Sequence, residues 1–269
     1  MIRLEQKLSR LKKIISDYRS CLIAFSGGVD STFLLKAATL ALPRERILAV
    51  TAYSSTFPKD ELVFSKNIAR GLGVRHKIIK TNELKDKGFV SNPINRCYFC
   101  KKELFARLKK LALKSKLDVV LDASNLSDES DLRPGSIAKR EYKIRSPLQE
   151  AGFTKEEIRK SSRELGLSTW DKPSLACLAS RVPYGTKISS RLLGRINRAE
   201  VYLRNAGFKQ VRLRHYDGLC RIEVEQKDIP RLVSKRKQVV DKLKKLGYNY
   251  VTIDLEGYRT GSMNEGIKP

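Results

Sequence analysis

The chain has 269 residues, 41% of them hydrophobic, which suits one large domain or a large and a small one. Lysine and arginine outnumber aspartate and glutamate by 55 to 29, so the formal net charge is +26. No apolar run approaches the length of a membrane span, and the N-terminus is too charged for a secretory signal. Five cysteines, an odd number, do not suggest a disulfide scaffold. We therefore expect a cytoplasmic protein with no membrane partner.

The first elements are a helix, a strand and a second helix. Apolar residues at helical spacing predict an amphipathic helix over residues 4–15. The short apolar run 21–25 predicts a buried strand. The glycine-containing segment 26–31, Ser-Gly-Gly-Val-Asp-Ser, follows directly, and a helix runs from it to about residue 41.

Segment 26–31 has the chemistry of a phosphate-binding loop. Adjacent glycines let the backbone approach an anion closely, and the following helix N-terminus offers free N–H groups. The segment lacks the Gly-Lys-Ser/Thr ending of a Walker loop. It resembles the pyrophosphate loop (PP-loop) of the ATP pyrophosphatases, which adenylate a carbonyl or carboxyl oxygen. The alternative is a tight turn that needs glycine for geometry alone.

The residues predicted to bind ATP lie in this loop and after the next strand. Hydroxyl donors and a carboxylate for Mg²⁺ come from the loop, and the backbone after the next strand is expected to meet the adenine. The predicted set is Ser26, Gly27, Gly28, Asp30, Ser31, Thr51 and Ala52.

Strands and helices alternate through the first half of the chain. Further strands are predicted at 46–52, 74–79 and 118–123, with helices at 59–70 and 103–116. This alternation predicts an α/β fold with a parallel sheet and helices on both faces. Ligands bind at the carboxyl ends of such strands, where segment 26–31 falls.

The C-terminal part has a different pattern. Thr154, with Glu157 at the capping-box position, predicts a helix to 165, and residues 170–185 are a predicted loop. A helix at 192–203, a hairpin around Asp217-Gly218, a basic helix at 228–246 and a strand at 250–254 follow. We expect two domains, residues 1–185 and a small α+β domain, residues 186–269.

The excess of positive charge has several interpretations. It is spread along the chain with glutamates interspersed, which is typical of a charge-rich surface such as that of heat-adapted proteins. Anionic small substrates and RNA are the alternatives.

Three of the five cysteines have positions that indicate chemistry. Cys97 and Cys100 form a C-x-x-C pair between the third strand and the next helix. Cys177 lies in a proline-containing loop between Lys172 and Arg181, cations that favour a thiolate. Cys21, in a buried strand, and Cys220, beside a hairpin turn, are expected to be inert.

Three thiolates suit some metal groups better than others. A closed zinc site needs a fourth ligand, which His76 or His215 would have to supply. A 4Fe–4S cluster held by Cys97, Cys100 and Cys177 would keep one iron open for a sulfide. No metal at all is the third alternative.

Longer motifs identify the chain as similar to one family. They lie at residues 131–135, 146–150, 170–181, 183–185 and 254–264. These segments resemble the LarE family, ATP-dependent sulfur transferases of the PP-loop superfamily that help build the nickel-pincer nucleotide of lactate racemase. Residues 122–128 depart from the usual family pattern, which begins Gly-Thr-Asn.

The resemblance implies a reaction and its partners. A carboxylate of pyridinium-3,5-dicarboxylic acid mononucleotide is adenylated and then converted to a thiocarboxylate. In one branch of the family the loop cysteine donates its own sulfur, and in another three cysteines hold a 4Fe–4S cluster that carries sulfide. The presence of Cys97 and Cys100 beside Cys177 favours the second branch. A sulfide source, other nickel-pincer biosynthesis proteins and a homo-oligomer are the further partners implied.

Arginines are the predicted substrate ligands. Cations over the transferring phosphate are expected from Arg133 and Arg181, unless these are surface residues. The resemblance suggests a phosphate or metal site at a subunit interface, whose alternative is a set of hairpin surface charges. Its members are Arg212, Arg214, Glu200 and Glu223.

Four interpretations of the function remain from the sequence. The first is the cluster-dependent sulfur transferase, and the second is the same reaction with Cys177 as a consumed donor. The third is a tRNA thiolase that uses the +26 charge, although no basic segment with interleaved aromatic residues supports binding to nucleic acid. The fourth is a carrier of sulfur or of a cluster that is not an enzyme.

Overall fold

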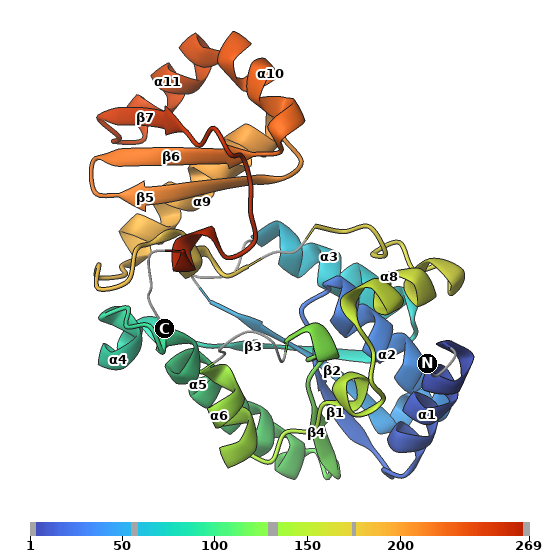
Figure 1. Cartoon of the computed structure of the whole chain (residues 1–269). Helices are drawn as coiled ribbons and strands as arrows, with labels where there is room; N and C mark the ends of the chain where they lie inside the picture. Colours follow the sequence, from blue (N-terminus) through green and yellow to red (C-terminus); the bar gives the residue numbers. More distant parts are fainter. Residues whose placement is uncertain (1–3, 55–58, 129–133, 174–175, 266–269) are drawn as a thin grey trace. The chain divides into compact units, whose positions relative to one another are not determined.

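The computed structural model describes residues 4–54, 59–128, 134–173 and 176–265 (Figure 1). The chain divides into two compact units, Met1–Phe89 with Ile94–Leu175, and Val90–Pro93 with Ala176–Pro269. The first unit thus ends before residue 185, the boundary expected from the sequence. Asn92 is one reason, because its side-chain amide donates to the carbonyls of Val182 and Pro183 and so binds both segments into the second unit.

The first unit is built on a four-stranded parallel sheet of order β3-β2-β1-β4. Its strands are β1 (Cys21–Ala24), β2 (Ile47–Tyr53), β3 (Arg75–Lys80) and β4 (Val119–Leu121). Leu22 of β1 is paired with Leu48 of β2 and with Val120 of β4. The α/β fold with a parallel sheet is confirmed.

Helices cover both faces of this sheet. The helices of this part of the chain are α1 (Leu4–Ser16), α2 (Val29–Ala41), α3 (Lys59–Gly71), α4 (Lys87–Val90), α5 (Arg96–Lys114), α6 (Gly135–Glu141), α7 (Pro147–Glu150) and α8 (Lys155–Glu164). Short 3-10 helices occur at Arg44–Arg46, Glu83–Lys85 and Leu126–Asp128.

Two separate hydrophobic cores follow from the alternation of side chains along the strands. Cys21 and Ile23 of β1 pack into a core with α1, α2 and α8, whereas Leu22 packs into the opposite core with α5 and α6. Because both faces are buried there, β1, β4 and most of β2 read as continuous apolar runs, whereas β3, at one edge of the sheet, is partly exposed and contains charged residues.

Helix α5 begins at Arg96, earlier than the predicted start at residue 103. The C-x-x-C pair therefore lies in the first turn of a helix and not in a loop before it. The aromatic residues within the pair account for the difference. Phe99 packs so closely on Gly88 that a Cβ there would lie 2.5 Å from its ring, and Tyr98 meets Phe99 edge to face.

The helix that follows the capping box is confirmed. Thr154 is the N-cap of α8: its side chain accepts from the Glu157 N–H, and the Glu157 carboxylate accepts from the Thr154 N–H. Lys7 of α1 also donates to this carboxylate at 2.7 Å. The Glu157 carboxylate that caps α8 therefore also binds α1.

The second unit is an α+β unit with a three-stranded sheet of order β5-β6-β7. Its elements are α9 (Ser190–Asn205), β5 (Val211–Tyr216), β6 (Leu219–Val224), α10 (Ile229–Ser234), α11 (Arg236–Lys245) and β7 (Tyr250–Ile253). Short 3-10 helices occur at Leu178–Arg181, Gln226–Asp228 and Ser262–Asn264. The predicted hairpin is confirmed, because β5 and β6 are antiparallel.

The single basic helix predicted over 228–246 is wrong, because two helices, α10 and α11, occupy this stretch. The Ser234 hydroxyl donates to the Arg231 carbonyl, a local bond that competes with the helical pattern, and Lys235 separates the two helices. Within the described part of the chain, no helix is both long enough and apolar enough to span a bilayer.

Candidate functional site

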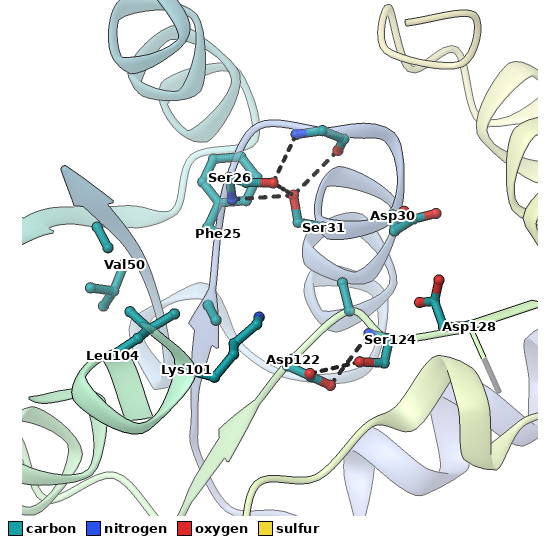
Figure 2. A pocket seen from close by; sticks show the side chains of 14 residues that line it. Phe25, Ser26, Asp30, Ser31, Val50, Lys101, Leu104, Asp122, Ser124 and Asp128 are labelled. Atoms are coloured by element: carbon teal, nitrogen blue, oxygen red, sulfur yellow. Dashed lines mark hydrogen bonds between the residues drawn. The ribbon is translucent and has the colours of Figure 1, made fainter. Parts of the chain in front are cut away.

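Segment 26–31 connects β1 to α2, as predicted, and Gly28 is the N-cap of α2 (Figure 2). Gly27 has φ +72°, and a Cβ there would lie 3.0 Å from the Ser65 Cβ of α3. Glycine is required at this position both by the backbone conformation and by the close packing on α3. Asp30 and Ser31 lie in the first turn of α2, where the helix N-terminus attracts negative charge.

The two serines of this loop bind each other. The Ser31 hydroxyl donates to the Gly28 carbonyl and lies 3.1 Å from the Ser26 hydroxyl, which accepts from the Gly28 N–H (Figure 2). These hydrogen bonds all lie within one short turn, and at 3.1–3.3 Å they are long. A bound phosphate could therefore accept from the same hydroxyl and N–H donors with little rearrangement of the loop.

The loop opens into a cavity of about 350 Å³ at the carboxyl ends of β1, β2 and β4 (Figure 2). This volume falls in the usual range for small-molecule sites. Its lining combines loop residues, strand ends and two residues of α5. The lining residues are Ala24, Phe25, Ser26, Gly28, Asp30, Ser31, Val50, Ala52, Lys101, Leu104, Asp122, Ala123, Ser124 and Asp128.

Asp30 lies in this cavity with one oxygen paired and one not. Its Oδ2 accepts from the ammonium of Lys155, the first residue of α8, at 2.5 Å. Its Oδ1 is buried and has no hydrogen-bond partner among the described residues. Asp122 and Asp128 also line the cavity, and the Asp122 carboxylate accepts from the Ser124 and Ser146 hydroxyls. Carboxylate oxygens are the ligands that Mg²⁺ prefers, so Asp30 and Asp128 fit the ion that the PP-loop resemblance implies.

Lys101, Asp128 and Lys155 were missed by the sequence analysis. Lys101 directly follows the C-x-x-C pair. It is a cavity residue because α5 begins at Arg96, before the C-x-x-C pair, and not at residue 103. Lys155 comes from a helix more than a hundred residues after Asp30, and no local pattern joins the two.

Of the two residues expected near the adenine, Ala52 lines the cavity and Thr51 lies behind it. The Thr51 hydroxyl donates to the Phe25 carbonyl at 2.7 Å. Because that hydroxyl has one proton, the contact with His76 Nε2 at 2.8 Å requires His76 to donate. Burial, with a smaller effect of Lys66, lowers the pKa of His76. This nitrogen is thus engaged in supporting the strand before the loop.

The cysteines divide into accessible and buried groups. Cys97 and Cys177 are exposed, and Cys100 is half-buried. Cys21 and Cys220 are fully buried, and burial raises the pKa of each thiol to about 12. The expected inertness of these two is supported, because a thiol with such a pKa is neither a nucleophile nor a ready ligand at neutral pH.

Cys97 and Cys100 belong to the first unit and Cys177 to the second. No group of three or more His, Cys, Asp or Glu side chains that could hold a metal ion occurs among residues 4–54, 59–128, 134–173 and 176–265. The cluster and the zinc site both remain predictions.

Arg181 is buried, with 1% of its surface exposed, so the alternative of a surface arginine is excluded. Its guanidinium forms a bidentate pair with the Glu200 carboxylate at 2.8 and 3.0 Å. A third nitrogen donates to the carbonyls of Ala176 and Cys177. Burial alone would raise the pKa of Glu200, but the charge and hydrogen bonds of Arg181 outweigh it and lower that pKa. Arg181 thus holds the backbone that carries Cys177.

Arg212 and Arg214 are also buried, which excludes hairpin surface charges. Arg214 forms a bidentate pair with Glu223 at 2.7 and 2.8 Å. The Arg212 guanidinium lies 5.1 Å from the Tyr258 ring centre. Burial, with the nearby charge of Arg181, lowers the pKa of Arg212 to about 10. This shift reflects first the burial of the guanidinium and second the neighbouring charge of Arg181 in the same buried cluster.

Two further predictions have separate outcomes. Arg133 lies outside the described residues. The expected effect of Lys172 and Arg181 on the Cys177 thiolate has no support in their contacts, because Lys172 pairs with Glu61 and Arg181 with Glu200.

No protein-family model matches the chain. Three known proteins match over nearly its full length. An uncharacterized protein of Synechocystis sp. is 42% identical over 263 residues, 97% of this chain and 98% of that protein. An uncharacterized protein of Methanocaldococcus jannaschii is 31% identical over 258 residues, 95% of this chain and 98% of that protein.

The third relative has a named activity. It is the pyridinium-3,5-bisthiocarboxylic acid mononucleotide synthase of Lactiplantibacillus plantarum, which is 36% identical over 267 residues. The match covers 99% of this chain and 97% of that protein, so both units are included. Identity at this level over the whole length shows the family, and the chain belongs to the LarE family of pyridinium-3,5-bisthiocarboxylic acid mononucleotide synthases.

Proposed function

We propose that this protein is an ATP-dependent sulfur transferase that converts a carboxylate of pyridinium-3,5-dicarboxylic acid mononucleotide into a thiocarboxylate. The observation that carries the proposal is a phosphate-binding loop that opens into a cavity, in a chain 36% identical to the synthase over its whole length. The product would serve nickel-pincer nucleotide biosynthesis. None of the five cysteines, which all lie within the described residues, forms a disulfide, and this suits a reducing cytoplasm.

In the first step the substrate carboxylate attacks the α-phosphorus of ATP, and pyrophosphate leaves. Ser26, Ser31 and the Gly28 N–H would bind the phosphates. Asp30 and Asp128 would hold Mg²⁺, which neutralises charge on the phosphates. Lys101 would add a cation beside the transferring group, a role expected from the sequence for Arg133 and Arg181.

In the second step a sulfur nucleophile attacks the acyl-adenylate carbon, and AMP leaves. Cys97, Cys100 and Cys177 would hold a 4Fe–4S cluster that supplies this sulfide. The accessibility of all three thiols, against the burial of Cys21 and Cys220, supports this donor set. The alternative is Cys177 as the consumed donor, which leaves dehydroalanine behind and needs no other cysteine.

The experiment separates these two routes with single Cys→Ala variants of the protein purified without oxygen. We expect Cys97→Ala, Cys100→Ala and Cys177→Ala each to lose iron and thiocarboxylate formation, while pyrophosphate release persists. Cys220→Ala is the matched control and should keep both. Full sulfur transfer by Cys97→Ala, together with a mass loss of about one H₂S at Cys177, would instead establish the consumed donor.

A tRNA acceptor is the second candidate, and the net charge of +26 favours it. The same assay tests it with tRNA in place of the mononucleotide. ATP-dependent formation of thiolated tRNA, without ATP-dependent thiolation of the mononucleotide, would contradict the proposal and establish tRNA as the acceptor.

A further inference from the structure

Lys172 belongs to the motif that precedes Cys177, yet its ammonium contacts the phosphate-binding loop. Its Nζ donates to the Gly27 carbonyl at 3.2 Å and to the Glu61 carboxylate at 2.7 Å. It also lies 3.5 Å from the ring centre of Phe64. Only 14% of the side chain is exposed. A lysine with so little of its side chain exposed is held by its contacts and is not a solvated surface charge.

Three residues of α3 form the surface on which the loop rests. Glu61 and Phe64 bind Lys172, and Ser65 contacts Gly27 so closely that a Cβ on this glycine would lie 3.0 Å from the Ser65 Cβ. Residues three and four apart lie on one face of a helix, so one face of α3 meets both the loop and Lys172. Gly27 is therefore enclosed between α3 and an ammonium.

The bond to the Gly27 carbonyl has a consequence for the neighbouring N–H. In a trans peptide the carbonyl and the following N–H point in opposite directions, and the described residues contain no cis peptide. When the Gly27 oxygen is held by Lys172, the Gly28 N–H faces Ser26 and the cavity (Figure 2). Rotation of this peptide would turn the N–H away from an incoming phosphate.

We propose that Lys172 is a positioning residue that fixes the Gly27–Gly28 peptide for phosphate binding. This inference rests on the proposed use of ATP and adds a residue to it. Lys172 does not touch the substrate. It acts through the backbone of the loop, and Glu61 places the ammonium.

The backbone of Lys172 is itself held in place. Arg159 of α8 donates to the carbonyls of Trp170 at 2.7 Å and Lys172 at 2.9 Å. Arg163 lies 5.0 Å from the ring centre of Trp170. The first part of the motif 170–181 is thus fixed on α8 and serves the ATP side, whereas Arg181 at its other end holds the Cys177 backbone. One sequence motif therefore serves two different sites.

The test compares Lys172→Met, Lys172→Arg and Lys160→Met in the full chain. Methionine keeps the length of the side chain and removes the donor, arginine keeps a cationic donor, and Lys160 is an exposed lysine of α8. Hydrogen–deuterium exchange of peptides containing residues 26–31 measures the loop without nucleotide. Calorimetry with Mg²⁺ and α,β-methylene-ATP measures affinity, and pyrophosphate release gives KM and kcat.

For Lys172→Met we expect faster exchange in the loop and a KM for ATP raised roughly tenfold, as for the loss of a charge-assisted hydrogen bond. The kcat should change less than about threefold, because the phosphate contacts exist in both the ground state and the transition state. Lys172→Arg should restore most of the affinity, and Lys160→Met should match the wild type.

Three results would overturn the inference. One is a Lys172→Met protein with a lowered Tm but wild-type KM and loop exchange, which indicates a role in stability alone. Another is an arginine variant as impaired as the methionine variant. The third is a weakened affinity with unchanged loop exchange. These readouts need no sulfur transfer, so a wild type that binds the nucleotide analogue but makes no thiocarboxylate would contradict the proposed function and not this inference.

Discussion

The cavity of the first unit and the buried cluster of the second unit use charged side chains in opposite ways. Around the cavity of the first unit the cations are lysines, and Lys155 makes a single contact with a carboxylate whose other oxygen has no partner among the described residues. In the buried cluster of the second unit the cations are arginines, and Arg181 and Arg214 each form a buried bidentate pair with a glutamate.

The difference indicates two physical tasks. A lysine ammonium is a point charge on a flexible stem and can exchange one partner for another at low cost. A bidentate arginine pair fixes direction as well as distance, and burial makes it costly to break. We infer that the lysine ammonium at the cavity can exchange its carboxylate partner for a nucleotide phosphate. The buried arginine–glutamate pairs instead hold the surrounding backbone of the second unit in one position.

The largest expected effect is a loss of stability when the buried cluster of arginines and glutamates in the second unit is changed. Glu200→Gln leaves the buried Arg181 and Arg212 without their shared counter-charge, so we expect the free energy of unfolding to fall by about 3–5 kcal/mol. Urea denaturation measures it. Glu256→Gln, at a carboxylate with 72% of its side chain exposed, is the control and should change stability by less than about 1 kcal/mol. If Glu200→Gln and Glu256→Gln are equally stable, the Arg181–Glu200 pair does not stabilise the second unit.

The second effect is on catalysis without a loss of fold. Asp30→Ala removes the carboxylate with the unpaired buried oxygen, and we expect pyrophosphate release to fall at least about 100-fold. The Tm should stay close to that of the wild type, because Asp30 is partly exposed on the first turn of α2. Asp17→Ala, at an exposed aspartate, is the matched control. Undiminished pyrophosphate release by folded Asp30→Ala would remove Asp30 from the mechanism.

The third effect tests whether Lys155 exchanges partners. If its ammonium moves from Asp30 to the nucleotide phosphates, Lys155→Met should slow pyrophosphate release roughly tenfold. The Asp30→Ala/Lys155→Met double variant should then be little slower than Asp30→Ala alone, because the two residues act together. Fully additive losses would show that they act independently.

The parallel sheet and the strand–loop–helix geometry of segment 26–31 could be predicted from the sequence because their signals are local. Residues 21–25 and 26–31 contain the strand, the glycines and the helix start in one short stretch. The capping box at Thr154 is equally local. In each case neighbours in the chain are neighbours in space.

The partners of the charged residues could not be predicted because they come from distant segments. Asp30 meets Lys155, Gly27 meets Lys172, and Arg181 meets Glu200 across a helix and a loop. Sequence spacing contains nothing about such pairs. The start of α5 was mispredicted for a related reason: Phe99 packs on Gly88, a contact that favours helix where cysteines and a proline suggested loop.

The smallest expected effect concerns pH and compares one histidine from each unit. Burial is the main cause that lowers the pKa of both His76 and His215 from an ordinary value of 6.5. Lys66 adds to the effect at His76 and Arg195 at His215, whereas Asp217 opposes it. Between pH 7.5 and 5.5 histidine is the side chain that ordinarily titrates, and the chain has 2 histidines.

The sign of the effect follows from proton binding. As the pH falls through 6.5, the unfolded chain binds protons that the folded protein, with its lowered pKa values, does not yet bind. Stability is therefore fully present above pH 6.5 and declines below it, so the Tm should fall modestly between pH 7.5 and 5.5. His215→Asn removes one of these groups and should flatten the slope of Tm against pH, whatever its effect on the Tm itself. His76→Asn should flatten it too, and would in addition remove the imidazole N–H that donates to Thr51 of β2. A Tm that rises on acidification, or a slope unchanged in both variants, would show that neither histidine is held neutral by the fold.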